Sequence, residues 1–173
     1  MVREALVAAG VEVIAGASLE GVERHADGRL RAVRTSSGDV PADLLLVALG
    51  VRPNTDFVRP DQVPLSRRGA LQPDPRGQVA DGVWAAGDCC ETQHRISREW
   101  VYLPLGTTAN KAGRATGTNI AGGNATFDGV LGSVITRFVA SGVHLEVAAT
   151  GLRLSQAQRL GLDAVELTTY GTT

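Results

Sequence analysis

The residues best suited to binding a polar ligand lie within positions 82–123. An apolar run at 83–86 stops abruptly at Gly87-Asp88, which places a lone carboxylate at the end of a predicted strand. A helix predicted over 106–121 begins with N–H groups that have no partner in the helix and with a partial positive charge. The carboxylate and the helix start together could hold a polar, partly anionic ligand.

Small residues share one face of this predicted helix, because they recur four positions apart. They are Ala109, Gly113, Gly117 and Ala121. A face without large side chains lets other atoms approach the backbone closely.

The two cysteines, Cys89 and Cys90, are adjacent. Neighbouring cysteines bond to each other only through a strained ring, so a structural disulfide is not expected. A packing role is favoured over redox chemistry, and the role of Cys90 stays open. The three histidines lack metal-ligand spacing, so no metal site is predicted. We interpret His94, Arg95 and Arg98 as surface charges rather than contacts to a phosphorylated substrate.

Composition favours an ordinary folded protein. The 173 residues suffice for one domain or two small ones, and 43% of them are apolar, enough for a core. A net charge of -1 argues against a basic nucleic-acid surface. The longest aliphatic run, 44–49, is too short to span a bilayer, and no N-terminal signal is visible. We therefore expect a cytoplasmic protein with neither nucleic-acid nor membrane partners.

Local signals predict the elements that precede residues 82–123. A helix over 2–9 is followed by a strand at 11–14. Two alternating runs, 19–25 and 30–35, flank Asp27-Gly28, a strong hairpin signal. After a turn at 36–39, the continuous apolar run 43–50 suits a strand buried on both faces of a parallel sheet.

Further elements are predicted around and after the helix. A short strand is expected over 69–74, and Gly122-Gly123 ends the helix. A hairpin over 134–140 and 143–149 turns at residues 141–142. A short helix with Ser155 as its cap and a strand at 164–169 follow.

Four separated segments carry a resemblance to a known family. GVWAAGDC, followed by PLGTTANKAGR, resembles the second flavin-binding segment of the pyridine nucleotide-disulfide oxidoreductases. ADLLLVALGVRPNT upstream and VAATGLRLSQAQRLGLDAV downstream agree, in the right order. The sequence is most similar to the NADH oxidase and coenzyme A-disulfide reductase branch.

The resemblance implies an α/β fold, in which a partial FAD/NAD(P)-binding Rossmann-like region precedes a partial α+β dimerisation domain. Residues 1–50 would end the nicotinamide-binding domain, and 51–122 would form the C-terminal segment of the FAD-binding domain. Residues 123–173 would begin the interface domain, through which family members form homodimers. Self-association is therefore expected.

The resemblance also implies the cofactors, FAD with NAD(P)H as co-substrate, and the residues that contact the flavin. Asp88, after Gly87, would accept hydrogen bonds from the ribityl chain. The flavin ring would lie against Leu105, Gly106, Thr107, Thr108 and Ala109. Asn110 stands where some coenzyme A-disulfide reductases have a substrate-contacting histidine, which argues against coenzyme A disulfide as the substrate.

Two hypotheses for the function follow. In the first, hydride passes from NAD(P)H through FAD to a disulfide or oxygen. The sequence contains neither G-x-G-x-x-G turn nor the family's redox cysteine, so a companion chain or upstream region would supply them and no catalytic residue is assigned here. In the alternative, the chain is a non-catalytic dimerisation or partner-binding module that has lost the cofactor. The isolated chain is expected to hold FAD weakly or not at all.

Overall fold

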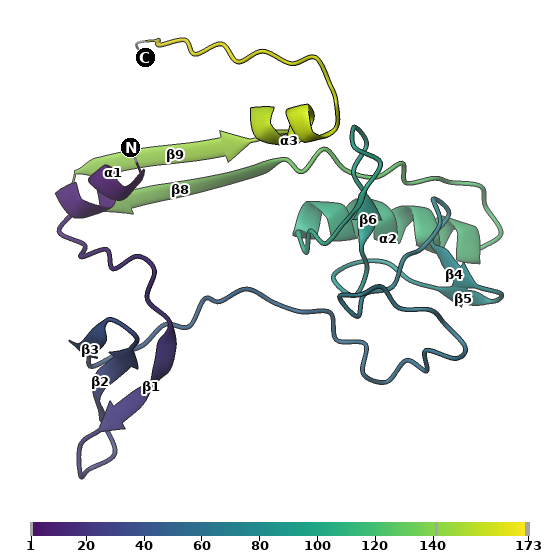
Figure 1. Ribbon diagram of the computed structural model, residues 1–173. Coiled ribbons are helices and arrows are strands. Elements are labelled where there is room, and N and C mark those ends of the chain that lie inside the picture. The colour runs from purple at the N-terminus through teal and green to yellow at the C-terminus, as the bar shows by residue number, and fades with distance from the viewer. Residues whose placement is uncertain (1, 141, 172–173) are drawn as a thin grey trace. The chain divides into compact units, whose positions relative to one another are not determined.

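The computed structural model describes residues 2–140 and 142–171, and its elements form a mixed α/β fold (Figure 1). Two compact units divide the chain. One comprises the residues up to Gly50 together with Thr136–Val147, and the other comprises Val51–Ile135 together with the residues from Ala148 on. None of the helices in the described part of the chain is long and apolar enough to cross a membrane.

The first unit contains helix α1 (Val2–Ala8) and a three-stranded antiparallel sheet in the order β1-β2-β3. Strands β1 (Leu19–Arg24) and β2 (Leu30–Thr35) confirm the predicted hairpin, with Val22 opposite Val33. The turn depends on Gly28, whose φ of 85° lies in the left-handed region that glycine adopts without strain. It also depends on Asp27, whose carboxylate accepts a hydrogen bond from the Arg29 N–H at 3.0 Å.

Residues 38–39 of the predicted turn instead begin strand β3 (Gly38–Pro41). This strand pairs antiparallel with β2, and Thr35 lies opposite Gly38. The run 43–50, predicted as a buried strand, forms none: Leu44, Leu46 and Leu49 are 86%, 87% and 79% exposed. The predicted strands at 11–14 and 164–169 are likewise absent. A strand exists only through hydrogen bonds to neighbouring strands, and no described segment pairs with these three.

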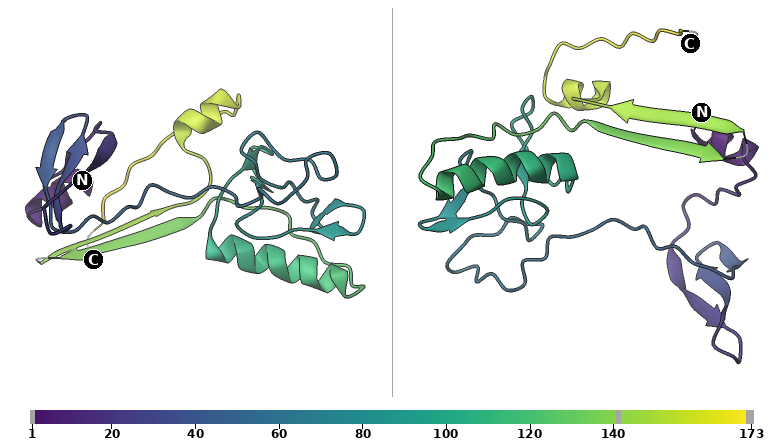
Figure 2. Two further views of the ribbon diagram at one scale, coloured as in Figure 1. Left: turned by 90° about the horizontal axis from the view of Figure 1, so that it is seen from below. Right: turned by 180° about the vertical axis from the view of Figure 1, so that it is seen from behind.

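The second unit contains helix α2 (Gly106–Ile120), which confirms the predicted helix to within one residue at its C-terminal end. Figures 1 and 2 show α2 as one straight, uninterrupted helix. Its buried residues are Ala115, Thr116 and Asn119, so the small-residue face at Gly113 and Gly117 is exposed.

Short strands complete this unit. Strand β4 (Gln78–Ala80) pairs with β5 (Val83–Trp84), and β6 (Thr92–Gln93) pairs with β7 (Trp100–Val101). The strand predicted at 83–86 is thus two residues shorter. The strand expected over 69–74 is reduced to a single parallel bridge between Leu71 and Cys90.

The core of the second unit is small. Its buried members are Val63, Leu71, Ala85 and Cys90. Hydrogen bonds from Asn119 add to this packing: its side-chain amide donates to the carbonyls of Arg76 (2.7 Å) and Ala125 (2.8 Å) and accepts the Ala125 N–H (2.8 Å). Asn119 therefore fixes the end of α2 to the chain on both sides of it.

The predicted second hairpin is confirmed as β8 (Val134–Ala140) and β9 (Val143–Ala149), which pair with each other. Residue 141 of its predicted turn lies outside the described residues, as do positions 172–173 at the end of the predicted interface region. The helix that follows, α3 (Leu154–Arg159), starts two residues earlier than predicted and has Arg153 rather than Ser155 as its N-cap.

Candidate functional site

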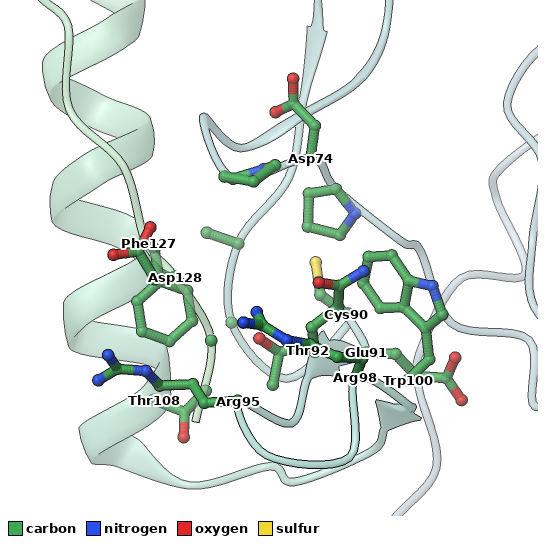
Figure 3. A pocket seen from close by; sticks show the side chains of 17 residues that line it. Asp74, Cys90, Glu91, Thr92, Arg95, Arg98, Trp100, Thr108, Phe127 and Asp128 are labelled. Atoms are coloured by element: carbon green, nitrogen blue, oxygen red, sulfur yellow. The ribbon is translucent and has the colours of Figure 1, made fainter. Parts of the chain in front are cut away.

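A cavity of about 560 Å³ lies beside the first half of α2 (Figure 3). Thr108 and Ala112 line it from the helix, and the rest of its wall comes from residues 73–75, from the segment between 86 and 100, and from 127–129. It contains charges of both signs and two aromatic rings: Asp74, Glu91, Asp128, Arg95, Arg98, Trp100 and Phe127.

The turn Gly87–Cys90 forms one edge of the cavity. The Cys90 N–H donates to the Gly87 carbonyl at 3.0 Å, which closes the turn, and the φ of 93° at Gly87 requires glycine. Two further bonds hold the turn in place: the Leu71 N–H donates to the Cys89 carbonyl (3.0 Å), and the Glu91 N–H donates to the Leu71 carbonyl (2.8 Å).

Asp88 is exposed at the tip of this turn. Its main-chain carbonyl accepts the Tyr102 hydroxyl at 2.9 Å, whereas its carboxylate accepts no hydrogen bond from any described residue. Partial burial and then the negative charge of Asp88 raise the pKa of Tyr102, which keeps the phenol protonated as a donor. The Asp88 carboxylate is thus free to accept hydrogen bonds from hydroxyl groups.

The N-terminus of α2 supplies the other edge. Its N-cap, Leu105, has extended backbone and makes no side-chain cap to the described helix, and the first intrahelical bond runs from the Ala109 N–H to the Leu105 carbonyl at 2.9 Å. The N–H groups of Gly106, Thr107 and Thr108 therefore have no partner within the helix. They give this end of α2 a partial positive charge.

A smaller cavity of about 160 Å³ adjoins this helix start. Leu105, Thr107 and Thr108 line it together with two cations, Arg95 and Lys111, and no carboxylate belongs to its described wall. The cations and the helix terminus have the same sign, so this cavity is suited to negative charge.

The structure brings most of the predicted site residues together. Gly87 and Thr108 line the larger cavity, and Leu105, Thr107 and Thr108 line the smaller one. Ala109 lies behind Gly87: a Cβ added to Gly87 would meet the Ala109 methyl at 3.7 Å. The remaining three, Asp88, Gly106 and Asn110, are exposed and line neither cavity.

The interpretation of His94 as a surface charge is wrong, because the residue is only 5% exposed. The Ser97 N–H donates to its Nδ1 (3.3 Å), so its Nε2 carries the proton and donates to the Leu131 carbonyl (3.3 Å). His94 therefore fixes the loop that presents Arg95 and Arg98 to the cavity.

The segment 127–129 also lines the larger cavity, and the sequence analysis did not predict this. The Phe127 N–H donates to the Pro75 carbonyl at 2.8 Å, and Gly129, with a φ of 90°, lies directly against the Gln93 carbonyl. The Asp128-Gly129 pair is a turn signal that could have located a bend here. No signal in the neighbouring sequence indicates that this bend contacts Pro75 and Gln93.

The cysteine pair lies in the same turn. Cys89 is half-buried and Cys90 is buried, and their Sγ atoms are 3.6 Å apart. A hydrogen bond from the Cys90 thiol lowers the pKa of Cys89 to about 6, and the same bond, with burial, raises the pKa of Cys90. Among the described residues no group of three or more His, Cys, Asp and Glu side chains is arranged to hold a metal ion.

Comparisons with known proteins agree with one another. The family described as pyridine nucleotide-disulphide oxidoreductase matches residues 1–113. The NAD(P)H sulfur oxidoreductase (CoA-dependent) of Pyrococcus furiosus is 37% identical over 84% of this chain and 31% of its own length. The NADH oxidase of Enterococcus faecalis is 28% identical over 98% of this chain and 37% of its own length.

Solved structures are similar too. A FAD-dependent pyridine nucleotide-disulphide oxidoreductase from Desulfovibrio vulgaris superposes with a TM-score of 0.81 and 34% identity, over 95% of this chain and 41% of that one. A NAD-dependent persulfide reductase from A. fulgidus gives a TM-score of 0.80 and 29% identity, over 94% of this chain and 29% of that one. The chain spans about a third of the length of the curated relatives that it matches.

Proposed function

This chain belongs to the pyridine nucleotide-disulphide oxidoreductase family, and we propose that it is the part of an FAD-dependent NAD(P)H oxidoreductase that holds the flavin ring and ribityl chain. In the whole enzyme, hydride would pass from NAD(P)H through FAD to a disulfide, a related sulfur compound or oxygen. The names of the relatives, sulfur oxidoreductase and NADH oxidase, support both kinds of acceptor.

One observation supports this proposal above the others: the Gly87–Cys90 turn and the start of α2 meet at the same cavity. Gly87 and Thr108 both line it, and Ala109 lies directly behind Gly87. A glycine and an alanine at this junction leave the backbone open to close approach by a flat ring.

The donors and acceptors at the junction fit a flavin. The free Asp88 carboxylate would accept hydrogen bonds from the ribityl hydroxyls, and such charge-assisted bonds are strong. The unpaired N–H groups at Gly106, Thr107 and Thr108 would stabilise negative charge on the reduced ring. When bound, the flavin supplies the hydride-transfer chemistry; the residues of this chain bind and orient it, and none of them is assigned a catalytic role.

The domain assignment forms part of the same proposal. Residues 1–50 belong to the nicotinamide-binding side, 51–122 to the flavin-binding side and 123–173 to a dimerisation region. Because the sequence has no Gly-rich dinucleotide turn, the pyrophosphate and nicotinamide sites come from another segment or a companion chain. Asn110, exposed as the fifth residue of α2, is the position that we assign to contact with the substrate.

The test is a titration of the chain with FAD, followed by quenching of flavin fluorescence. We expect weak binding that desalting removes. Asp88→Asn should weaken it about tenfold, the size expected for a lost hydrogen bond to a charged group. Asp81→Asn, at an exposed aspartate in the turn between β4 and β5, is the matched control and should change nothing. Equal affinities for the wild type and Asp88→Asn would contradict the proposal.

A second candidate function, a partner-binding module, is favoured by the exposure of Leu44, Leu46 and Leu49. Such a run of large apolar side chains in water promotes association with another surface. If the chain is only such a module, it associates with itself or a companion and binds no flavin in either state. Sedimentation with and without FAD separates this outcome from the first proposal.

A further inference from the structure

Arg98 has a backbone conformation that the rest of the described chain reserves for glycine. Its φ is 62°, in the left-handed region, and every other described residue with a φ in this region is a glycine. A residue with a side chain is strained there, because its Cβ lies too close to a carbonyl oxygen. Such strain persists only where the surrounding structure imposes it, and it is concentrated at ligand-binding and catalytic sites.

Hydrogen bonds on both sides of the loop between β6 and β7 impose this conformation. The Arg98 N–H donates to the His94 carbonyl (2.8 Å), and the His94 N–H donates to the Glu99 carbonyl (2.9 Å). The Arg95 N–H donates to the Val130 carbonyl (2.8 Å), which ties the loop to the segment beside it. A glycine at position 98 would make the same main-chain bonds without the strain. The backbone therefore does not account for an arginine here, and its side chain has to.

The side chains of Arg98 and Arg95 both line the larger cavity (Figure 3). Neither guanidinium makes a hydrogen bond or an ion pair with any residue that the structure describes. A guanidinium presents five N–H donors in a planar fork, which matches the two oxygens of a carboxylate. The loop thus offers two unpaired anion-binding groups to one cavity.

The cavity wall also contains three carboxylates, which limit the charge of a ligand. Asp74 accepts two main-chain N–H groups of its own turn, at 2.8 and 2.9 Å. Glu91 accepts the Gln72 side-chain amide at 2.8 Å and lies 3.7 Å from the Arg68 guanidinium. Asp128 has no partner among the described residues. Because all three carboxylates would repel additional negative charge, the wall favours a ligand with a single negative charge over a multiply charged one.

Apolar surface lies beside these charges. Trp100, in β7 directly after the loop, and Phe127 contribute aromatic rings to the wall, and Ala86 and Ala112 contribute methyl groups. Aromatic rings pack favourably against one another and against arginine planes. A ligand that combines one carboxylate with a planar apolar body matches both parts of this wall.

From these observations we propose that the β6–β7 loop forms a binding site for small aromatic carboxylates. Arg98 binds the carboxylate, Arg95 supplies the second cation, and Trp100 contacts the ring. The site uses residues of the cavity wall other than Gly87 and Thr108, so it does not depend on the proposed flavin contact.

The first experiment titrates the full chain with benzoate and follows the indole N–H signals by NMR. The sequence contains two tryptophans, Trp84 and Trp100, and the variant Trp84→Phe assigns their signals. We expect benzoate to shift the Trp100 signal, with a dissociation constant on the order of 1 mM, and to leave the Trp84 signal in place. No shift of the Trp100 signal would overturn the proposal. No flavin is present, so this outcome is independent of the proposed function.

Two comparison compounds test the chemistry of the ligand. Benzyl alcohol has the ring without the charge, and inorganic phosphate has the charge without the ring. Each should bind at least about tenfold more weakly than benzoate, because each lacks one of the two matched groups. Binding of either compound as tightly as benzoate would contradict the assignment of an aromatic carboxylate.

The second experiment separates the guanidinium of Arg98 from the backbone strain. Arg98→Gln keeps the strain and removes the charge, whereas Arg98→Gly removes both. Both variants should bind benzoate at least about tenfold more weakly, the loss expected for hydrogen bonds between charged groups. Arg98→Gly should also unfold at a higher urea concentration than Arg98→Gln, because glycine adopts the left-handed region without strain.

The matched control is Arg114→Gln, at an exposed arginine of α2 that lines neither cavity. It removes the same charge and should bind benzoate as the wild type does. Wild-type affinity in Arg98→Gln would overturn the role of Arg98. An equal loss in Arg114→Gln would mean that only the net charge matters, and would overturn the site as well.

Discussion

Helix α2 and the run 43–50 are both strongly patterned stretches of this chain, yet only one of them forms regular structure. The helix bonds its own backbone from end to end, and Asn119 ties it to segments on both sides. The apolar run forms no strand, and Leu44, Leu46 and Leu49 remain exposed. A helix satisfies its hydrogen bonds within itself, whereas a strand needs neighbours.

The difference bears on the candidate site. The Gly87–Cys90 turn and the start of α2 are fixed by contacts within the second unit alone. The edge that we propose as the flavin contact can therefore form without the run 43–50. This conclusion is tested by pairs of variants, in which one member changes a buried or hydrogen-bonded residue and the other changes an exposed one.

The largest effect is expected for Asn119→Ala. This change leaves the Arg76 carbonyl and both main-chain groups of Ala125 without their partner, so we expect a loss of about 3 kcal/mol in the free energy of unfolding. Asn110→Ala, on the exposed face of the same helix, should cost less than about 0.5 kcal/mol. Urea denaturation of the two variants measures the difference, and equal midpoints would mean that Asn119 does not anchor α2.

A smaller loss is expected for Leu71→Ala. Leu71 is 7% exposed and belongs to the buried cluster, so its truncation should cost about 2 kcal/mol, near the low end for core leucines because the cluster is small. Leu46→Ala makes the same chemical change at 87% exposure and should leave the unfolding midpoint unchanged. A comparable loss at Leu46 would show that the run 43–50 is packed in solution.

The smallest effect on folding is expected for the double variant Leu44→Ser and Leu46→Ser. Both side chains are exposed, so stability should stay within about 0.5 kcal/mol of the wild type. Self-association should fall, because exposed apolar surface is removed. Sedimentation velocity over a range of concentrations checks this. An unchanged tendency to associate would locate the contact surface elsewhere.

The sequence predicted the elements that local signals specify. Asp27-Gly28 identified the first hairpin, and helix periodicity identified α2. The predictions of strands at 11–14, 43–50 and 164–169 were wrong, because an apolar pattern does not show whether a partner strand is present. Strand β3 was missed because a turn signal at 36–39 hid the pairing of Gly38 with Thr35.

The same distinction applies to the site. The motif around Gly87 and the segment around Thr108 could be singled out from the sequence, and both line one cavity. The cavity's remaining wall could not. Phe127 lies in the wall because its N–H bonds to the Pro75 carbonyl, and the loop that carries Arg95 is held by a hydrogen bond between His94 and the Leu131 carbonyl. Neither long-range contact has a local signature.

The most direct test of the account compares the affinities of this chain for FAD and for riboflavin. The proposed contacts, Asp88 and the N-terminus of α2, involve only the ribityl chain and the ring, which both ligands possess. We therefore expect weak binding of both, with dissociation constants that differ by less than about fivefold, or about 1 kcal/mol. Binding of FAD without binding of riboflavin would mean that this chain recognises the adenosine or pyrophosphate half, and would contradict the proposed site.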